Sequence, residues 1–164
     1  MPNPVNPNKL KIGWFSFSCC EDSTIMFTEM LNDHWSQWRD KIHFQHARVL
    51  QKKNVFEDID VAFIEGAVSS VSDEEEVKKI RAVAKKVVTI GSCATTGLPS
   101  GQRNQFDEDT QNCIKFLLDH FGQADKVKSI PEVIAVDEKV PGCPMDEKKF
   151  LEVLDKYLKE FGIT

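Results

Sequence analysis

The chain has 164 residues, enough for one domain that buries roughly 70% of the surface its unfolded form exposes. Its 21 Lys and Arg residues are outnumbered by 26 Asp and Glu and form no basic stripe, which argues against a nucleic-acid partner. The five cysteines are an odd number, and no window resembles a signal peptide or reaches the roughly 18 apolar residues of a membrane span. We therefore expect a cytoplasmic protein, not inserted in a membrane, whose thiols bind metal or take part in redox chemistry.

Apolar periodicity predicts alternating strands and helices after a proline-containing tail at 1–8, so the folded domain is expected to span 9–164. In chain order, the predicted elements are a strand at 10–17, a helix at 22–38, strands at 42–50 and 61–68, a helix at 72–86, a strand at 87–90, a helix at 107–121, a strand at 133–136 and a helix at 146–161. Asp22 and Ser23 are expected to cap the first helix, and Ser72 with Glu75 forms a predicted capping box for the second.

Strands that alternate with helices of this length indicate crossover connections and a mainly parallel sheet covered on both faces. The sequence therefore predicts a single-domain α/β fold, doubly wound and flavodoxin-like. The irregular strand at 42–50 suits an edge position.

The positions of four cysteines are the strongest functional signal. Cys19 and Cys20 follow the first predicted strand, Cys93 follows the strand at 87–90, and Cys143 lies on the loop after the last one. Ligands of open parallel sheets bind beyond the carboxyl ends of the strands, where several loops converge. We therefore expect these four thiols to form one metal or cluster site.

Three further residues are expected at this edge. Gly91 and Gly142 precede cysteines, and glycine lets a backbone approach closely and direct N–H groups at sulfur. Glu65 ends the third predicted strand and is expected either to face the same crevice or to be a solvated loop acid. Cys113, by contrast, has helical spacing to Phe116 and predicts a buried thiol in the core.

The residues leave three kinds of site open. Zinc usually takes cysteines in closely spaced pairs, whereas the thiols of this chain come from distant segments, which favours an iron–sulfur cluster. A flavodoxin-like module that binds FMN would need a phosphate cradle after the first strand, where Glu21 and Asp22 would repel phosphate. The cluster is the preferred interpretation, with a zinc or FMN module as the alternative.

Four motifs in this order resemble the small, cluster-bearing subunit of [NiFe] hydrogenases and the homologous 20 kDa subunit of NADH:quinone oxidoreductases. They are the cysteine loop after the first strand, Val-Ala-Phe-Ile-Glu-Gly-Ala at 61–67, Gly-Ser-Cys-Ala at 91–94 and Pro-Gly-Cys-Pro at 141–144. The resemblance implies a flavodoxin-like domain with a [4Fe-4S] cluster that faces a large subunit, in which a nickel–iron centre forms or splits H2. It also implies that Cys19 or Cys20, Cys93 and Cys143 are cluster ligands.

Two departures from the hydrogenase pattern affect the interpretation. Cys19 and Cys20 adjoin, as in the quinone-reducing relative, so the backbone must turn at Cys19 for both thiols to reach one cluster. The cysteines of further clusters are absent from this sequence, so we expect one cluster, no catalytic residue of its own, and a separate electron carrier. The expected function is electron transfer in a cytoplasmic [NiFe] hydrogenase, with a relay subunit of a quinone-reducing complex as the alternative.

Overall fold

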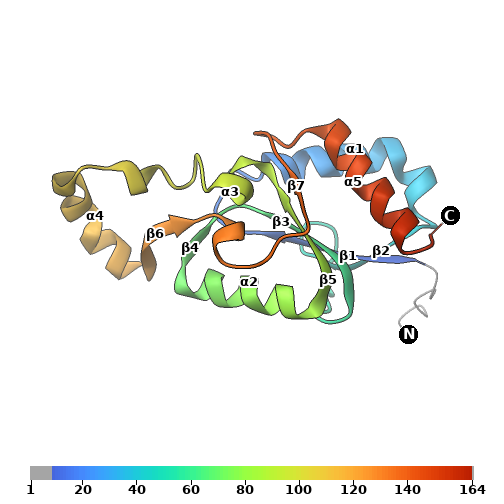
Figure 1. Ribbon diagram of the computed structural model, residues 1–164, viewed down its shortest axis with the longest axis horizontal. Helices are drawn as coiled ribbons and strands as arrows, with labels where there is room; N and C mark the ends of the chain where they lie inside the picture. The colour runs from blue at the N-terminus through green and yellow to red at the C-terminus, as the bar shows by residue number, and fades with distance from the viewer. Residues whose placement is uncertain (1–8, 164) are drawn as a thin grey trace.

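The computed structural model describes residues 9–163, so the predicted tail at 1–8 lies outside the described residues. Figure 1 shows a central sheet with helices on both faces and an arm that projects from one end. In chain order, the elements are β1 (Leu10–Ser16), α1 (Asp22–Trp38), β2 (Ile42–Ala47), β3 (Ile59–Glu65), β4 (Val68–Ser70), α2 (Val71–Val83), β5 (Ala84–Ile90), α3 (Gly91–Thr96), the short 3-10 helix η1 (Gln102–Gln105), α4 (Glu108–His120), β6 (Gln123–Lys128), the 3-10 helix η2 (Ile130–Glu132), β7 (Glu138–Val140) and α5 (Glu147–Glu160).

The central sheet has five parallel strands in the order β2-β1-β3-β5-β7. This is the flavodoxin-like order, with β2 at an edge as expected, so the predicted fold class is confirmed. Every residue of β3 is buried, as required of a strand covered on both faces.

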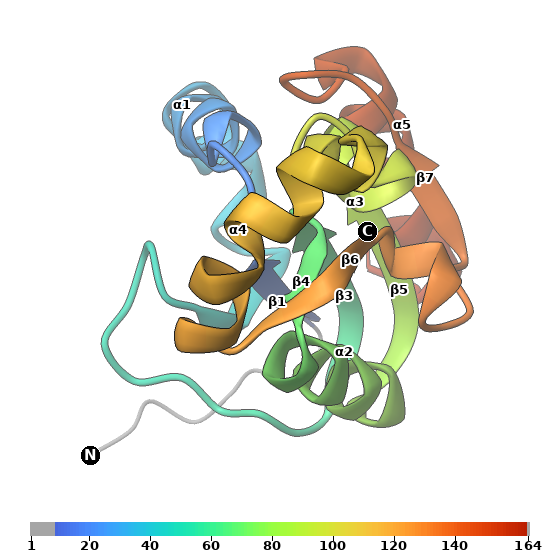
Figure 2. The same ribbon diagram turned by 90° about the vertical axis from the view of Figure 1, so that its left-hand side faces the viewer.

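The two faces of the sheet carry separate apolar clusters because alternate residues of a strand point to opposite sides. Phe63 of β3 belongs to the cluster beneath α1 and α5, which also contains Phe27 and Phe150. Ile64 belongs to the other cluster, beneath α2, which contains Ile80. Figures 1 and 2 show α1 and α5 together on one side and α2 on the other.

The second helix begins earlier than the capping pattern predicts. Ser70 accepts a hydrogen bond from the Asp73 N–H, and the Asp73 carboxylate accepts one from the Ser70 N–H, so the capping box is two residues before Ser72 and Glu75. Ser70 ends β4 in extended conformation, which brings its side chain to the cap position. The helix also ends at Val83, because β5 starts at Ala84, before the predicted boundary.

The last strand of the sheet was predicted at the wrong position. Residues 133–136 form no strand; Val133, Ile134 and Val136 pack, partly buried, against the cluster beneath α2. The strand is instead β7, which contains only one apolar residue and pairs with β5. The apolar run at 133–136 indicated contact with the core but not the form of the backbone.

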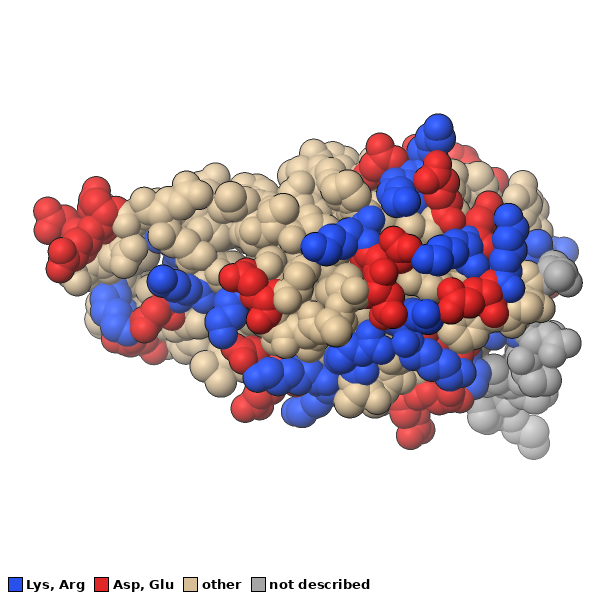
Figure 3. Space-filling view, in the orientation of Figure 1, with Lys and Arg blue, Asp and Glu red and all other residues tan. Residues whose placement is uncertain are grey.

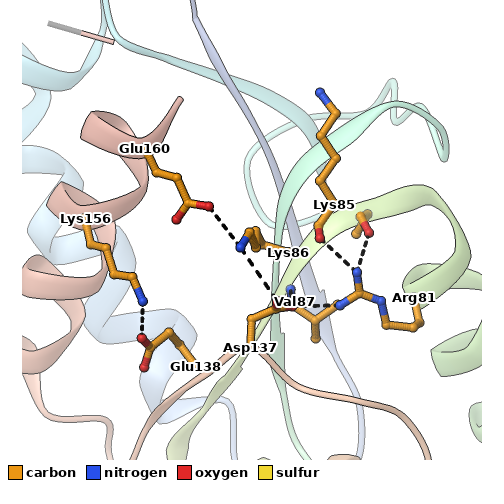
Figure 4. A network of polar contacts seen from close by, with 9 residues as sticks. Arg81, Lys85, Lys86, Val87, Asp137, Glu138, Lys156 and Glu160 are labelled. Carbon is orange, nitrogen blue, oxygen red and sulfur yellow. Dashed lines mark hydrogen bonds and ion pairs between the residues drawn. The ribbon is translucent and has the colours of Figure 1, made fainter. Parts of the chain in front are cut away.

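A network of ion pairs and hydrogen bonds fixes the loop before β7 beside β5. Asp137 accepts hydrogen bonds from Arg81 (2.8 Å) and from the Val87 N–H (2.8 Å), as Figure 4 shows. Lys86 pairs with Glu160 of α5 at 2.9 Å. The pKa of Asp137 lies below its ordinary value: burial would raise it, but the Val87 N–H and Arg81 outweigh burial.

The arm consists of η1, α4 and β6, and β6 pairs antiparallel with β4 in a second, small sheet. Neither β4 nor β6 was predicted as a separate strand. Asn104 of η1 holds β6 through both backbone groups of Val127, at 2.7 and 2.9 Å. Figure 1 shows that the arm extends beyond α3, the short helix that follows β5, and so from the carboxyl end of the sheet.

Candidate metal centre at the carboxyl edge of the sheet

The carboxyl ends of four neighbouring strands lie in one row. Strand pairing joins Ser16 to Glu65, Glu65 to Ile90 and Ile90 to Val140, and each of these is the last residue of its strand. Parallel pairing in register therefore ends the strands at one level, and the chain after each of them leaves at the same edge.

A cysteine occurs at the same distance after three of these four strand ends. Cys19 follows Ser16, Cys93 follows Ile90, and Cys143 follows Val140, each by three residues. The sequence had placed Cys143 seven residues beyond its strand, because the strand itself was predicted too early. With β7 at its observed position, each of the three cysteines lies three residues after the end of its strand.

All four predicted ligands line one small hollow at this edge. Cys93 is buried, Cys19 is half-buried, and Cys20 and Cys143 are exposed. Glu65, Gly91 and Gly142 line the same hollow, so the seven predicted site residues come together. The hollow is also lined by five residues that were not among the predicted site residues: Asp22, Ser23, Ile90, Ser92 and Pro144.

The backbone bends at Cys19, as two adjacent cysteines facing one hollow require. Ser18 forms two hydrogen bonds with Ala67: the Ser18 N–H donates to the Ala67 carbonyl at 3.1 Å, and the Ser18 carbonyl accepts from the Ala67 N–H at 3.0 Å. Glu21 then adopts the left-handed conformation, with φ of 64°, before α1 begins. Attachment on one side and a left-handed residue on the other confine the turn to residues 18–21.

Gly91 and Gly142 join two cysteine segments to each other. Both have positive φ, 77° and 116°, a conformation that favours glycine, and the Gly142 carbonyl accepts a hydrogen bond from the Ser92 N–H at 2.7 Å. A Cβ on Gly142 would lie 2.5 Å from the Pro144 carbonyl oxygen. Their role in the described structure is this close packing; contact with a bound group remains a prediction.

Glu65 is neither solvated nor in a loop, because its side chain is buried at the end of β3. Its carboxylate accepts hydrogen bonds from the N–H groups of Ser23 (3.0 Å) and Thr24 (3.1 Å) and from the Thr24 hydroxyl. Glu65 of β3 therefore caps α1 from outside the helix. The predicted caps, Asp22 and Ser23, are wrong: the N-cap residue is Glu21, and its side chain makes no capping hydrogen bond.

The thiol of Cys19 is strongly disposed to remain protonated in the chain alone. Burial and, after it, the negative charge of Glu65 raise its pKa to about 12. A metal that binds a thiol displaces its proton, so coordination would have to supply the free energy of deprotonating Cys19.

The four thiols suit a group with several separated binding positions. They come from three segments and surround the hollow, and no disulfide joins any of the five cysteines. Within residues 9–163, no three Cys, His, Asp or Glu side chains approach closely enough to share a single metal ion. A four-iron cluster takes one thiolate at each iron, which fits this dispersed donor set.

Cys113 lies away from the hollow, but the prediction that it is buried is wrong. It is exposed on α4, and so are Phe116 (73%) and Leu117 (49%); Phe121, directly after the helix, is also exposed (68%). The helical spacing of these residues does form one face, yet α4 belongs to the projecting arm, away from the central sheet, and this face stays exposed. Amphipathic spacing predicts a face to be covered, not the molecule that covers it.

None of the helices in residues 9–163 is both long and apolar enough to cross a membrane.

Comparison with known proteins confirms the resemblance. The family model described as NADH ubiquinone oxidoreductase, 20 Kd subunit, matches residues 19–157. The chain is 31% identical to a subunit of the F420-non-reducing hydrogenase of Methanothermobacter marburgensis, over 92% of this chain and 54% of that protein. It is 24% identical to the delta subunit of the NAD-reducing hydrogenase HoxS of Cupriavidus necator, over 90% of this chain and 78% of that protein. The chain thus spans about half the length of the first relative and more of the second.

Solved structures share the fold. One chain of an NAD+-reducing [NiFe]-hydrogenase in the H2-reduced state superposes with a TM-score of 0.73 at 24% identity, covering 92% of both chains. A Ni-Fe-Se hydrogenase from Desulfomicrobium baculatum gives a TM-score of 0.64 at 14% identity, covering 90% of this chain and 61% of that one. Because the family model spans most of the sequence, the chain belongs to the family of the 20 kDa subunit of NADH ubiquinone oxidoreductase.

Proposed function

We propose that this chain is the electron-transfer small subunit of a cytoplasmic [NiFe] hydrogenase and holds one [4Fe-4S] cluster through Cys19, Cys20, Cys93 and Cys143. The observation that carries the proposal is the meeting of these four thiols around one hollow, with three of them at the same offset from strand ends in one row. When bound, such a cluster accepts and releases single electrons.

The chain's own residues would hold the cluster and keep its surroundings still. The bonds of Ser18 to Ala67 and of Ser92 to Gly142 tie the cysteine segments to neighbouring structure. A site whose ligands are fixed before and after electron transfer needs little rearrangement, which suits a relay. The exposure of Cys20 and Cys143 leaves one side of the site open to a partner.

The proposed partners are a large subunit with the nickel–iron centre and a further electron carrier. The relatives named as hydrogenase subunits support this assignment. In Figure 3, charged residues cover the body of the molecule, the tip of the arm and its lower side, while the upper surface over α3 and the segment that leads to α4 is largely uncharged. Interface centres are typically poor in charge and rich in aromatic residues, such as the exposed Phe116 of α4 and Phe121 directly after it.

Metal and acid-labile sulfide analysis of the anaerobically purified full chain tests the proposal. We expect about four iron and four sulfide per chain, and Cys→Ser substitution at 19, 20, 93 or 143 should lower the iron content. Cys113→Ser is the matched control and should leave iron unchanged, because Cys113 lies on the arm. One zinc per chain, or bound FMN without iron, would contradict the cluster.

A relay subunit of a quinone-reducing complex is the second candidate, favoured by the adjacency of Cys19 and Cys20. Nickel in the purified complex, together with H2-dependent reduction of a dye, distinguishes the hydrogenase from this alternative. A complex that contains the cluster but neither nickel nor this activity would favour the second candidate.

A further inference from the structure

We propose that Ser100 is a positioning residue that donates a hydrogen bond to the sulfur of Cys93 and raises the reduction potential of the bound cluster. This inference rests on the proposed function. The Ser100 Oγ lies 3.1 Å from Cys93 Sγ and 2.7 Å from the Ser18 carbonyl oxygen. The half-buried Ser100 side chain therefore lies between two of the cysteine segments.

The hydroxyl has one hydrogen and two candidate acceptors, and the state of Cys93 decides between them. A neutral thiol is a weak acceptor, so the carbonyl of Ser18 is preferred in the chain without metal. A thiolate bound to iron carries negative charge and accepts a stronger, charge-assisted bond. The Ser18 carbonyl also accepts the Ala67 N–H at 3.0 Å, so it keeps a partner when Ser100 turns to the sulfur.

The backbone holds Ser100 in place from both sides. The Gly101 N–H donates to the Gly97 carbonyl at 2.7 Å, and the Gly97 N–H donates to the Cys93 carbonyl at 2.9 Å. A Cβ on Gly101 would lie 2.6 Å from the Gly97 oxygen, so this close return of the chain requires glycine at 101. The loop after α3 thereby folds back over Cys93 and presents Ser100 to its sulfur.

A donor at a cluster sulfur stabilises the reduced state more than the oxidised state, because reduction adds negative charge. Ser100→Ala removes the donor without removing a cysteine. We expect the variant to retain the cluster and to be reduced less readily by about tenfold in the equilibrium constant, which is 59 mV for one electron.

The test is an EPR-monitored redox titration of the anaerobically purified full chain, with iron and sulfide measured on every sample. Ser100→Thr keeps the hydroxyl and should restore the wild-type potential. Thr96→Ala is the matched control: its hydroxyl, on the same segment, donates to the Ser92 carbonyl at 2.9 Å and not to sulfur. Its potential should not change.

The outcomes separate this inference from the function on which it rests. Absence of iron and sulfide from the unaltered chain overturns the cluster itself. With the cluster present, equal potentials for the wild-type, Ala and Thr chains overturn only the role of Ser100, as does an Ala shift that Thr does not reverse. Ser100→Ala and Ser100→Gly could also fold, as judged by circular dichroism, and yet lose iron. In that case Ser100→Thr decides: recovery of the iron content and of the wild-type potential supports the positioning role, and failure to recover them refutes it.

Discussion

Replacing Glu65 tests whether the carboxyl edge of the sheet depends on a cap supplied across the fold. Glu65→Ala removes one buried acceptor group that is bonded to three donors: the N–H groups of Ser23 and Thr24 and the Thr24 hydroxyl. The two N–H groups lose their acceptor, whereas the Thr24 hydroxyl can still reach the Ser16 Oγ at 3.3 Å. An unsatisfied buried donor costs about 1–3 kcal/mol, and water that enters the vacated space recovers part of this cost. We expect a loss of about 3–5 kcal/mol in the free energy of unfolding.

Anaerobic urea unfolding of the full chain, followed by circular dichroism, measures this loss. Glu65→Gln keeps the shape and one acceptor oxygen, so it should lose less, about 1–2 kcal/mol. Glu29→Ala removes an exposed acid from α1 and should stay within about 0.5 kcal/mol of wild type. A loss below about 1 kcal/mol for Glu65→Ala would refute the reasoning, because the three donors would then have found other partners.

Three further predictions concern the core, the arm and the ionic network. Phe150→Ala should lower the free energy of unfolding by about 3–5 kcal/mol, because the Phe150 side chain is only 1% exposed. Phe116→Ser should change it by less than about 0.5 kcal/mol, because Phe116 is 73% exposed. Equal losses for the two variants in urea unfolding would contradict the exposure of α4. Asn104→Ala should speed amide exchange at Val127 by about tenfold or more while β3 stays protected, and unchanged exchange would mean that Asn104 does not hold β6. Asp137 has a lowered pKa when folded, so its stabilisation is complete above the unfolded pKa of about 3.9 and is lost as pH falls through the folded value. The difference in urea midpoint between wild type and Asp137→Asn should therefore be constant from about pH 5 to 7 and shrink below about pH 4; a constant difference down to pH 2 would contradict this.

The apolar segments were sufficient to predict β1, β2, β3 and β5 and the parallel fold class, because buried parallel strands leave a strong pattern in the sequence. The signal failed for β7, whose sequence Glu-Lys-Val has a single apolar residue. Its place in the sheet depends on Asp137, which bonds to Val87 of β5, a contact between residues 50 positions apart. Local periodicity contains no information about such a contact.

Capping patterns failed for a related reason. Ser72 and Glu75 match the spacing of a capping box, but β4 holds Ser70 extended, and the helix therefore begins directly after it. The cap of α1 is supplied by Glu65, more than forty residues away in sequence. Where a tertiary contact supplies the acceptor, the residues near the helix start do not reveal the cap.

The convergence of the cysteines could be predicted because it follows from topology: parallel strands end at one edge, and each predicted ligand follows a strand. What could not be predicted is how that edge is fixed. Of the four strand ends in the row, three are followed by cysteines, and the fourth, in the middle, is Glu65. Its carboxylate accepts hydrogen bonds from the first turn of α1, which begins two residues after Cys20. Ser23 of α1 in turn accepts a hydrogen bond from the N–H of Met145, beyond Cys143, at 3.2 Å. Glu65, which the sequence assigned to the site, thus links the segments of Cys20 and Cys143 through α1. The positions of these thiols depend on Glu65 even if its carboxylate does not contact the bound group.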